Sequence, residues 1–172
     1  MEERTNVITM KGKGLTLLGP ELEAGGRAPD FTVLDQELQP LSLHDLSGKI
    51  VVVSVTPSLD TSTCDLQARR FNEEAASLPE SVVVLNVSMD LPFAIARFCT
   101  AAGISSVKVL SDHREASFGK AYGVLIKELR LLARSIFIID REGIIRYIEV
   151  VPEASNPPDY DGALEALAAL RP

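Results

Sequence analysis

Three short runs of β-branched and apolar residues constrain the fold of this chain more than any other feature. They lie at residues 50–55, 82–87 and 135–139. Runs of this length without polar alternation are typical of strands buried on both faces of a sheet. Helical spacing of apolar residues is found between and after them, at residues 65–78, 92–102, 114–122 and 161–170. Alternating buried strands and helices predict an α/β fold whose central mixed β-sheet is flanked by helices.

Three further pairs of segments predict hairpins. Residues 7–10 and 15–18 flank a glycine-containing loop, which favours an N-terminal β-hairpin, and residues 31–34 and 41–43 form a second such pair. The turn at residues 140–143 makes its two flanking strands antiparallel. A βαβ unit followed by a ββα unit is the element order of a thioredoxin-like fold. No linker or repeat interrupts the sequence, so we expect one domain over residues 1–172.

The composition is that of a globular chain that buries its own core. The chain has 172 residues, of which 46% are hydrophobic and 24% charged, and this length supports a core without disulfides or metals. With 17 Lys+Arg against 24 Asp+Glu, the net charge of −7 disfavours nucleic acid and anionic lipid as partners. No apolar run is long enough for a membrane span, and residues 1–4 do not resemble a signal peptide. We therefore expect a cytoplasmic protein that binds neither nucleic acid nor membranes.

The two cysteines, Cys64 and Cys99, leave two interpretations open. No CxxC or HExxH motif is present, and the two histidines are far apart in the sequence, so we expect no metal and no other cofactor. A cytosolic chain of this size needs no structural disulfide. The thiols are therefore either inert core residues, as free cysteines often are, or the site of redox chemistry.

Cys64 occupies a position that favours a reactive thiol. Residues 55–67 run from a buried strand into a helix and place Cys64 in the first helical turn, where free backbone N–H groups and the helix dipole favour an anion. A thiol of ordinary pKa, about 8.5, is only about 3% thiolate at pH 7, and the thiolate is the nucleophile. Thr61 can direct its hydroxyl at the sulfur or at a bound oxygen, whereas Asp60 and Asp65 oppose a thiolate, so a nearby cation is required. The alternative is that a threonine caps the helix and Cys64 is a small core residue.

The pattern Pro57-x-x-x-Thr61-x-x-Cys64 is the Pro/Thr/Cys motif of the peroxiredoxins, and the chain resembles their thiol peroxidase subfamily. The resemblance covers nearly the whole chain, and the second cysteine and Arg134 stand at family-like positions. Residues 62, 63 and 100 depart from those familiar in the family. Besides the N-terminal hairpin, the matching stretches are residues 26–31, 57–61, 64–67, 70–72, 111–114, 118–119, 122–125 and 131–134.

The resemblance implies a thiol-dependent peroxidase that reduces hydrogen peroxide and organic hydroperoxides. Cys64 would be the peroxidatic cysteine that attacks the O–O bond, and Thr61 would orient the peroxide and hydrogen-bond the thiolate. Arg134, at the entrance to a buried strand, would supply the required cation and polarise the leaving oxygen. Pro57 would shield the sulfur from water. For Arg134 the alternative is a surface salt bridge.

Cys99 lies in a mostly apolar predicted helix, where the simplest interpretation is a packed core residue. By resemblance to the atypical two-cysteine peroxiredoxins, it would instead resolve a sulfenic acid at Cys64 as an intrachain disulfide, which thioredoxin would reduce. A disulfide needs Cα atoms within about 7 Å, whereas axes of packed helices lie about 8–10 Å apart. Both helices are therefore expected to unwind locally on oxidation. The resemblance also implies a homodimer.

Two other functions are compatible with the predicted fold. A thioredoxin-type thiol–disulfide oxidoreductase is disfavoured because residues 62–65 contain one cysteine instead of a CxxC pair. A non-catalytic thioredoxin-like binding module would keep both thiols inert. Peroxide consumption in the presence of thioredoxin and its reductase distinguishes these two from a peroxidase.

Overall fold

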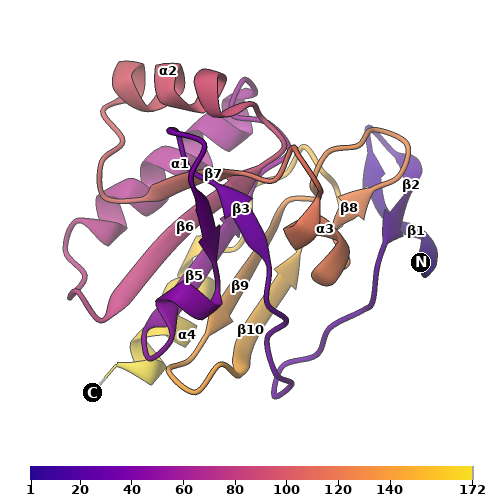
Figure 1. The fold of residues 1–172 in the computed structure, drawn as a ribbon. Helices are drawn as coiled ribbons and strands as arrows, with labels where there is room; N and C mark the ends of the chain where they lie inside the picture. Colours follow the sequence, from indigo (N-terminus) through magenta and orange to yellow (C-terminus); the bar gives the residue numbers. More distant parts are fainter. Residues whose placement is uncertain (172) are drawn as a thin grey trace.

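A computed structural model describes residues 1–171, which form a seven-stranded mixed sheet and a smaller three-stranded sheet (Figure 1). The large sheet has the strand order β10-β9-β5-β6-β7-β3-β4, and the small sheet has the order β1-β2-β8. The strands are β1 (Glu3–Met10), β2 (Lys13–Leu18), β3 (Thr32–Leu34), β4 (Pro40–Ser42), β5 (Ile50–Val55), β6 (Val82–Ser88), β7 (Lys108–Ser111), β8 (Leu125–Ile126), β9 (Ser135–Ile139) and β10 (Ile145–Val150).

The β-branched runs form the centre of the large sheet, as predicted. Every residue of β5 is buried, because β6 pairs with it in parallel on one side and β9 pairs antiparallel on the other. The register places Val55 opposite both Val87 and Ser135. The thioredoxin-like fold is thus confirmed, and the ends of three strands meet where the chain leaves β5.

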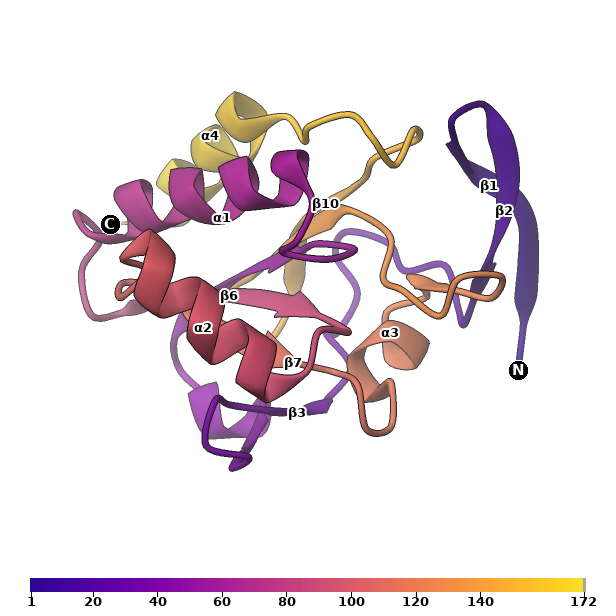
Figure 2. The ribbon, with the colours of Figure 1, turned by 90° about the horizontal axis from the view of Figure 1, so that it is seen from above.

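Helices cover the two faces of this sheet unequally (Figure 2). On one face α1, α2 and α4 bury a mainly aliphatic layer, and on the other face α3 and the N-terminal hairpin bury a second layer. Alternate residues of β5 point to the two layers, since Val52 belongs to the first and Val53 to the second. The helices are α1 (Ser62–Ala75), α2 (Pro92–Ala102), α3 (Ser117–Ala121) and α4 (Tyr160–Leu170), with a short 3-10 helix at His44–Leu46. Across residues 1–171 no helix is long and apolar enough to cross a bilayer.

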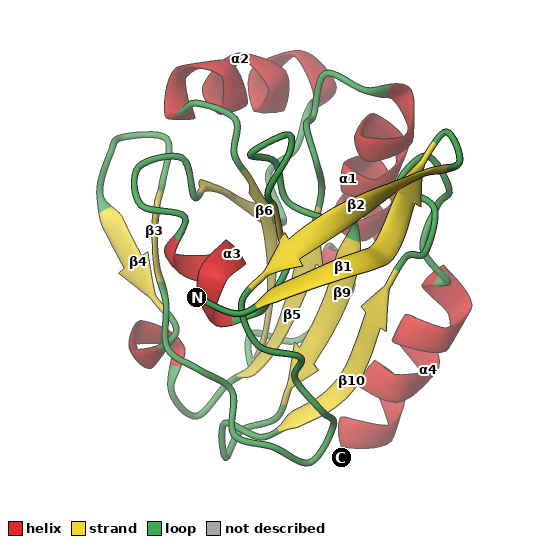
Figure 3. Cartoon of the chain, turned by 90° about the vertical axis from the view of Figure 1, so that its right-hand side faces the viewer, coloured by secondary structure: helices red, strands yellow, loops and turns green. Residues whose placement is uncertain are grey.

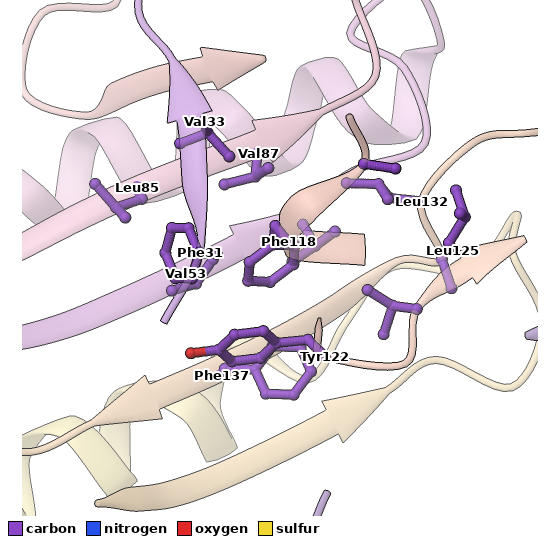
Figure 4. Packing of buried hydrophobic residues seen from close by; sticks show 14 of the residues in the cluster. Phe31, Val33, Val53, Leu85, Val87, Phe118, Tyr122, Leu125, Leu132 and Phe137 are labelled. Atoms are coloured by element: carbon purple, nitrogen blue, oxygen red, sulfur yellow. The ribbon is translucent and has the colours of Figure 1, made fainter. Parts of the chain in front are cut away.

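Aromatic side chains concentrate in the layer beneath α3 (Figure 4). The rings of Phe118 and Tyr122 stack with centroids 4.4 Å apart, and Phe31 and Phe137 meet them edge-on. Edge-to-face and stacked pairs of this kind add stability beyond the area they bury. The aromatic cluster therefore lies on the face of the sheet opposite to α1 and α2.

The N-terminal hairpin crosses the edge of the molecule in front of the large sheet (Figure 3). Its turn consists of Lys11 and Gly12, both with positive φ, so the loop is shorter than the predicted residues 11–14. The end of β1 lies beside the segment that follows β10, because the Thr9 N–H donates to the Pro152 carbonyl at 2.8 Å. The hairpin is thus joined to the large sheet's last connection.

Two helices differ in extent from the predictions. The first helix spans Ser62–Ala75 rather than 65–78, so it ends before the turn that leads to Pro79. The third spans Ser117–Ala121 rather than 114–122, because Ala116 has a left-handed φ of 51° and the buried Asp112 carboxylate accepts the first helical N–H groups instead. The short strands β7 and β8 were not predicted, since neither has a long apolar run.

Asp112 makes the stability of this region depend on pH. Burial raises the pKa of its carboxyl from 3.8 to about 6, although the N–H groups of Gly119 and Phe118 act in the opposite direction. The folded chain therefore binds this proton more tightly than the unfolded chain, and the associated stability is lost as pH rises from about 4 to about 6.

We expect the effect to appear as a pH-dependent difference between the wild type and Asp112→Asn. The free energy of unfolding of the wild type relative to the variant should fall by about 2–3 kcal/mol between pH 4 and pH 7. Urea denaturation at several pH values measures this difference. A difference that stays constant over this range would contradict the raised pKa.

Candidate active site

Cys64 lies in the first turn of α1 and is fully buried, with 0% of its surface exposed. The first backbone hydrogen bond of the helix runs from the Asp65 N–H to the Thr61 carbonyl, at 2.9 Å. The N–H groups of Ser62, Thr63 and Cys64 precede that bond, so they form the positive end of the helix dipole. The thiol therefore sits where negative charge is stabilised, as predicted from the sequence.

The loop between β5 and α1 carries the other two residues of the motif. Pro57 is buried two residues after the end of the strand, and Thr61 is the exposed N-cap residue of the helix. The Thr61 hydroxyl donates to the Ser58 carbonyl at 3.0 Å, so its role toward the Cys64 sulfur or a peroxide stays a prediction. Asp90 fixes this loop from the end of β6, because its carboxylate accepts the Ser58 hydroxyl and the Leu59 N–H, each at 2.8 Å.

Arg134 is buried immediately before β9, with 2% of its surface exposed. Its Nε and Nη2 atoms both donate to the Ala154 carbonyl, at 3.2 and 3.1 Å, and Nη1 donates to the Gln67 Oε1 atom at 2.9 Å. Within residues 1–171 no carboxylate forms an ion pair with this guanidinium. The surface salt bridge is therefore the wrong interpretation, and the side chain is a buried cation held by neutral oxygens.

Gln67 connects this cation to the helix that carries Cys64. It lies three residues after Cys64 on the same buried face of α1, and its amide Nε2 donates to the Ser54 hydroxyl at 2.7 Å and to the Val55 carbonyl at 3.3 Å. Because its N–H₂ group donates to these two residues of β5, its side-chain oxygen is left to accept the N–H of Arg134. Sequence reasoning assigned no role to Gln67, although a glutamine on the apolar face of a helix signals a buried polar contact.

The sheet register brings Arg134 to the Cys64 end of the fold. Val55, the last residue of β5, pairs with Ser135, so the loop that leads to Cys64 starts beside Arg134. The charges of Arg134 and Cys64 both affect Tyr160, at the start of α4. Burial raises the pKa of its phenol, the positive charges of Arg134 and Arg70 lower it, and negative charge on Cys64 raises it. Tyr160 is a second residue near the site that the sequence did not indicate.

Cys99 lies on the separate helix α2, inside the aliphatic layer, and is 7% exposed. Both cysteines are free, so no disulfide joins the two helices in this structure. Burial raises the pKa of the Cys99 thiol, with a smaller opposing effect from Gln36. A protonated thiol is a poor nucleophile, so burial makes Cys99 a poor nucleophile in this conformation. In the part of the chain that the structure describes, no three His, Cys, Asp or Glu side chains gather as metal ligands.

Comparison with known proteins identifies the family. A family described as Redoxin matches residues 23–164. The thiol peroxidase of Halalkalibacterium halodurans is 56% identical over 94% of this chain and 97% of its own length, and that of Bacillus subtilis is 56% identical over 95% and 97%. The chain belongs to the thiol peroxidases of the Redoxin family. It is therefore a peroxiredoxin-type peroxidase.

Solved structures agree with this family. A crystal structure of a peroxiredoxin-like protein from Aquifex aeolicus superimposes with a TM-score of 0.90 at 41% identity, covering 96% of this chain and 98% of that chain. A thiol peroxidase from Chromobacterium violaceum has a TM-score of 0.82 over 94% and 95% of the two chains. At 20% identity, this second likeness supports the fold alone. The enzyme thus has the architecture of its family over nearly its whole length.

The contact between Gln67 and Arg134 generates a stability prediction. Gln67→Leu leaves a buried charged donor without its acceptor and should lower the free energy of unfolding by about 2–3 kcal/mol. The exposed Gln39 provides a matched control. Gln39→Leu should change the free energy of unfolding by less than about 0.5 kcal/mol. Urea denaturation compares the two variants. Equal stability of both would contradict the structural role of the Gln67 amide.

Proposed function

We propose that the enzyme reduces hydrogen peroxide and organic hydroperoxides with Cys64 as the attacking thiolate, Cys99 as the resolving thiol and thioredoxin as the reductant. The observation that carries the proposal is the buried Arg134 guanidinium, which has no carboxylate partner within residues 1–171 and is tied through Gln67 to the helix of Cys64. A buried cation of this kind stabilises an anion beside it. The anion that the chemistry requires is the Cys64 thiolate.

In the first step, the Cys64 thiolate attacks the distal oxygen of the hydroperoxide. The S–O bond forms as the O–O bond breaks, so the sulfur is oxidised to a sulfenic acid and the second oxygen leaves as an alkoxide or hydroxide that takes up a proton. Negative charge moves from the sulfur to the leaving oxygen during this step. The fixed charge of Arg134 and the N–H groups at the start of α1 stabilise that charge without reorganising.

In the second step, the Cys99 sulfur attacks the sulfenic sulfur, the S–S bond forms, and the oxygen leaves as water. Cys99 must first leave its buried, protonated state, which requires α2 to loosen. The carbonyl of Cys99 accepts the N–H groups of Gly103 and Ile104 at the C-terminal end of the helix. The turn that has to open is thus the last one, where helices unfold most easily.

Thioredoxin would reduce the disulfide and return both thiols, a transfer of two electrons by thiol–disulfide exchange. The resemblance to the two-cysteine peroxiredoxins supports this reductant, and it supports a cytoplasmic homodimer as the working form.

Peroxide-dependent oxidation of NADPH in the presence of thioredoxin and its reductase tests the complete cycle. Peroxide consumption that other dithiols support and thioredoxin does not would contradict the choice of reductant.

The two cysteine-to-serine variants provide a matched pair. Cys64→Ser should abolish peroxide turnover, because one oxygen for one sulfur changes little volume but removes the reactive thiolate. Cys99→Ser should consume the first equivalent of peroxide at the wild-type rate, then stall as the sulfenic acid and overoxidise to the sulfinic acid. Stopped-flow kinetics and intact mass measure these outcomes.

Either of two results would overturn this assignment of the cysteines. Turnover by Cys64→Ser near the wild-type rate would remove Cys64 from the reaction. Normal cycling of Cys99→Ser with thioredoxin would make Cys99 a packing residue, as the simplest interpretation of the sequence allowed.

Arg134→Met retains the length of the side chain and removes its charge. We expect the second-order rate constant for peroxide to fall by more than about tenfold, which corresponds to about 1.4 kcal/mol of barrier. Arg146→Met is the matched control, because Arg146 pairs with Asp140 at the far end of the sheet and should not affect the rate. Equal rate constants for the two variants would contradict the role of Arg134.

A further inference from the structure

The segment at residues 152–155 lies between the N-terminal hairpin and the active site. It follows β10, and Figure 2 shows this connection close to the turn of the hairpin. On one side it contacts β1 and the hairpin turn, and on the other side it contacts Arg134 and the first turn of α1. One short stretch of backbone therefore connects a peripheral hairpin to the residues around Cys64.

The carboxylate of Glu153 makes most of the side-chain contacts on the hairpin side. Its Oε2 atom accepts the Thr9 hydroxyl at 2.5 Å and the Gly12 N–H at 3.3 Å. Its Oε1 atom accepts the Lys11 N–H at 2.9 Å and the Ser155 hydroxyl at 2.9 Å. The hydroxyl of Thr9 and the N–H of Lys11 hold the pKa of this carboxyl at about 2. The Glu153 carboxylate is therefore ionised at neutral pH.

Backbone hydrogen bonds align the segment with the hairpin in the same place. The Thr9 N–H donates to the Pro152 carbonyl and the Ala154 N–H donates to the Thr9 carbonyl, each at 2.8 Å. These bonds pair Thr9 with Glu153 as a short parallel bridge. Ala154 is thus held by the hairpin through its own N–H group, next to the carbonyl that faces the active site.

The opposite side of the segment supplies two acceptors to the active site. The Ala154 carbonyl accepts both Nε and Nη2 of Arg134, which defines the plane of the guanidinium. The Ser155 carbonyl accepts the Thr63 hydroxyl at 3.3 Å, one residue before Cys64. Any displacement of the segment would therefore tilt the cation and release a contact to the turn that carries the reactive thiol.

We propose that Glu153 is a positioning residue for the peroxidase reaction. Its carboxylate binds the N-terminal hairpin to residues 152–155 and thereby holds the Arg134 guanidinium in place beside Cys64. The inference rests on the proposed role of Arg134. Charge stabilisation of a transition state depends on preorganised geometry, and displacements near 1 Å reduce rates measurably. The N-terminal hairpin is then part of the catalytic framework although none of its residues reaches Cys64.

A double-mutant cycle tests this inference with the full-length enzyme. Glu153→Gln replaces an acceptor oxygen by an N–H₂ group and should lower the second-order rate constant for hydrogen peroxide by about fivefold. In an Arg134→Met background, the same substitution should cost less than about twofold, because the group through which Glu153 acts is absent. A general loss of stability would lower both rates by the same factor.

Glu3→Gln is the matched control, because it makes the same substitution at a carboxylate of the hairpin itself. Glu3 pairs with the exposed Lys127 and does not contact residues 152–155. Its rate constant should stay within about twofold of the wild type, as expected for a surface pair. Thr9→Val provides a milder second variant if Glu153→Gln does not fold, and its smaller effect should likewise disappear in the Arg134→Met background.

The outcomes separate this inference from the proposed function. If Glu153→Gln leaves the rate unchanged, or lowers it by equal factors in both backgrounds, the positioning role is wrong while the role of Arg134 stands. If Arg134→Met itself leaves the rate unchanged, the proposed role of the cation fails and the inference fails with it.

Discussion

The buried guanidinium of Arg134 is the interaction on which the site depends. Removing a charge from water costs several kcal/mol, and burial without a carboxylate leaves that cost only partly offset by hydrogen bonds. Here two neutral oxygens, from Gln67 on α1 and from Ala154 after β10, accept three of its five N–H groups. No carboxylate among residues 1–171 pairs with it. In the proposed mechanism, this positive charge stabilises the Cys64 thiolate. The cation thereby connects α1 with the segment that follows β10.

The two layers of the core suit different tasks. The aromatic cluster lies beneath α3, where Phe31, Phe118, Tyr122 and Phe137 interlock. The helices that carry the two cysteines lie on the other face, over a mainly aliphatic layer that includes Cys99. That layer holds one buried aromatic residue, Phe71, which packs against Tyr160. The sheet thereby separates the main aromatic cluster from the helices that carry the cysteines.

Sequence reasoning reached the fold and the position of Cys64 because these depend on local patterns. The run at residues 50–55 predicted β5 correctly, since a strand buried on both faces carries apolar residues on both faces, here at every position except Ser54. The burial of Arg134 followed from its place beside another such run. Gln67 and Glu153 were not predicted, because their roles arise from contacts with residues distant in the sequence. No hydrophobic periodicity or sequence motif indicates that the Ala154 carbonyl, after β10, accepts hydrogen bonds from Arg134, before β9.

The most direct test of this account is the ionisation of Cys64 with and without Arg134. In Cys99→Ser, Cys64 is the only thiol, and its thiolate absorbs near 240 nm. The account predicts a strong thiolate absorbance at pH 7 that Arg134→Met largely abolishes in the same background. Equal thiolate absorbance at pH 7 with arginine and with methionine at this position would contradict it.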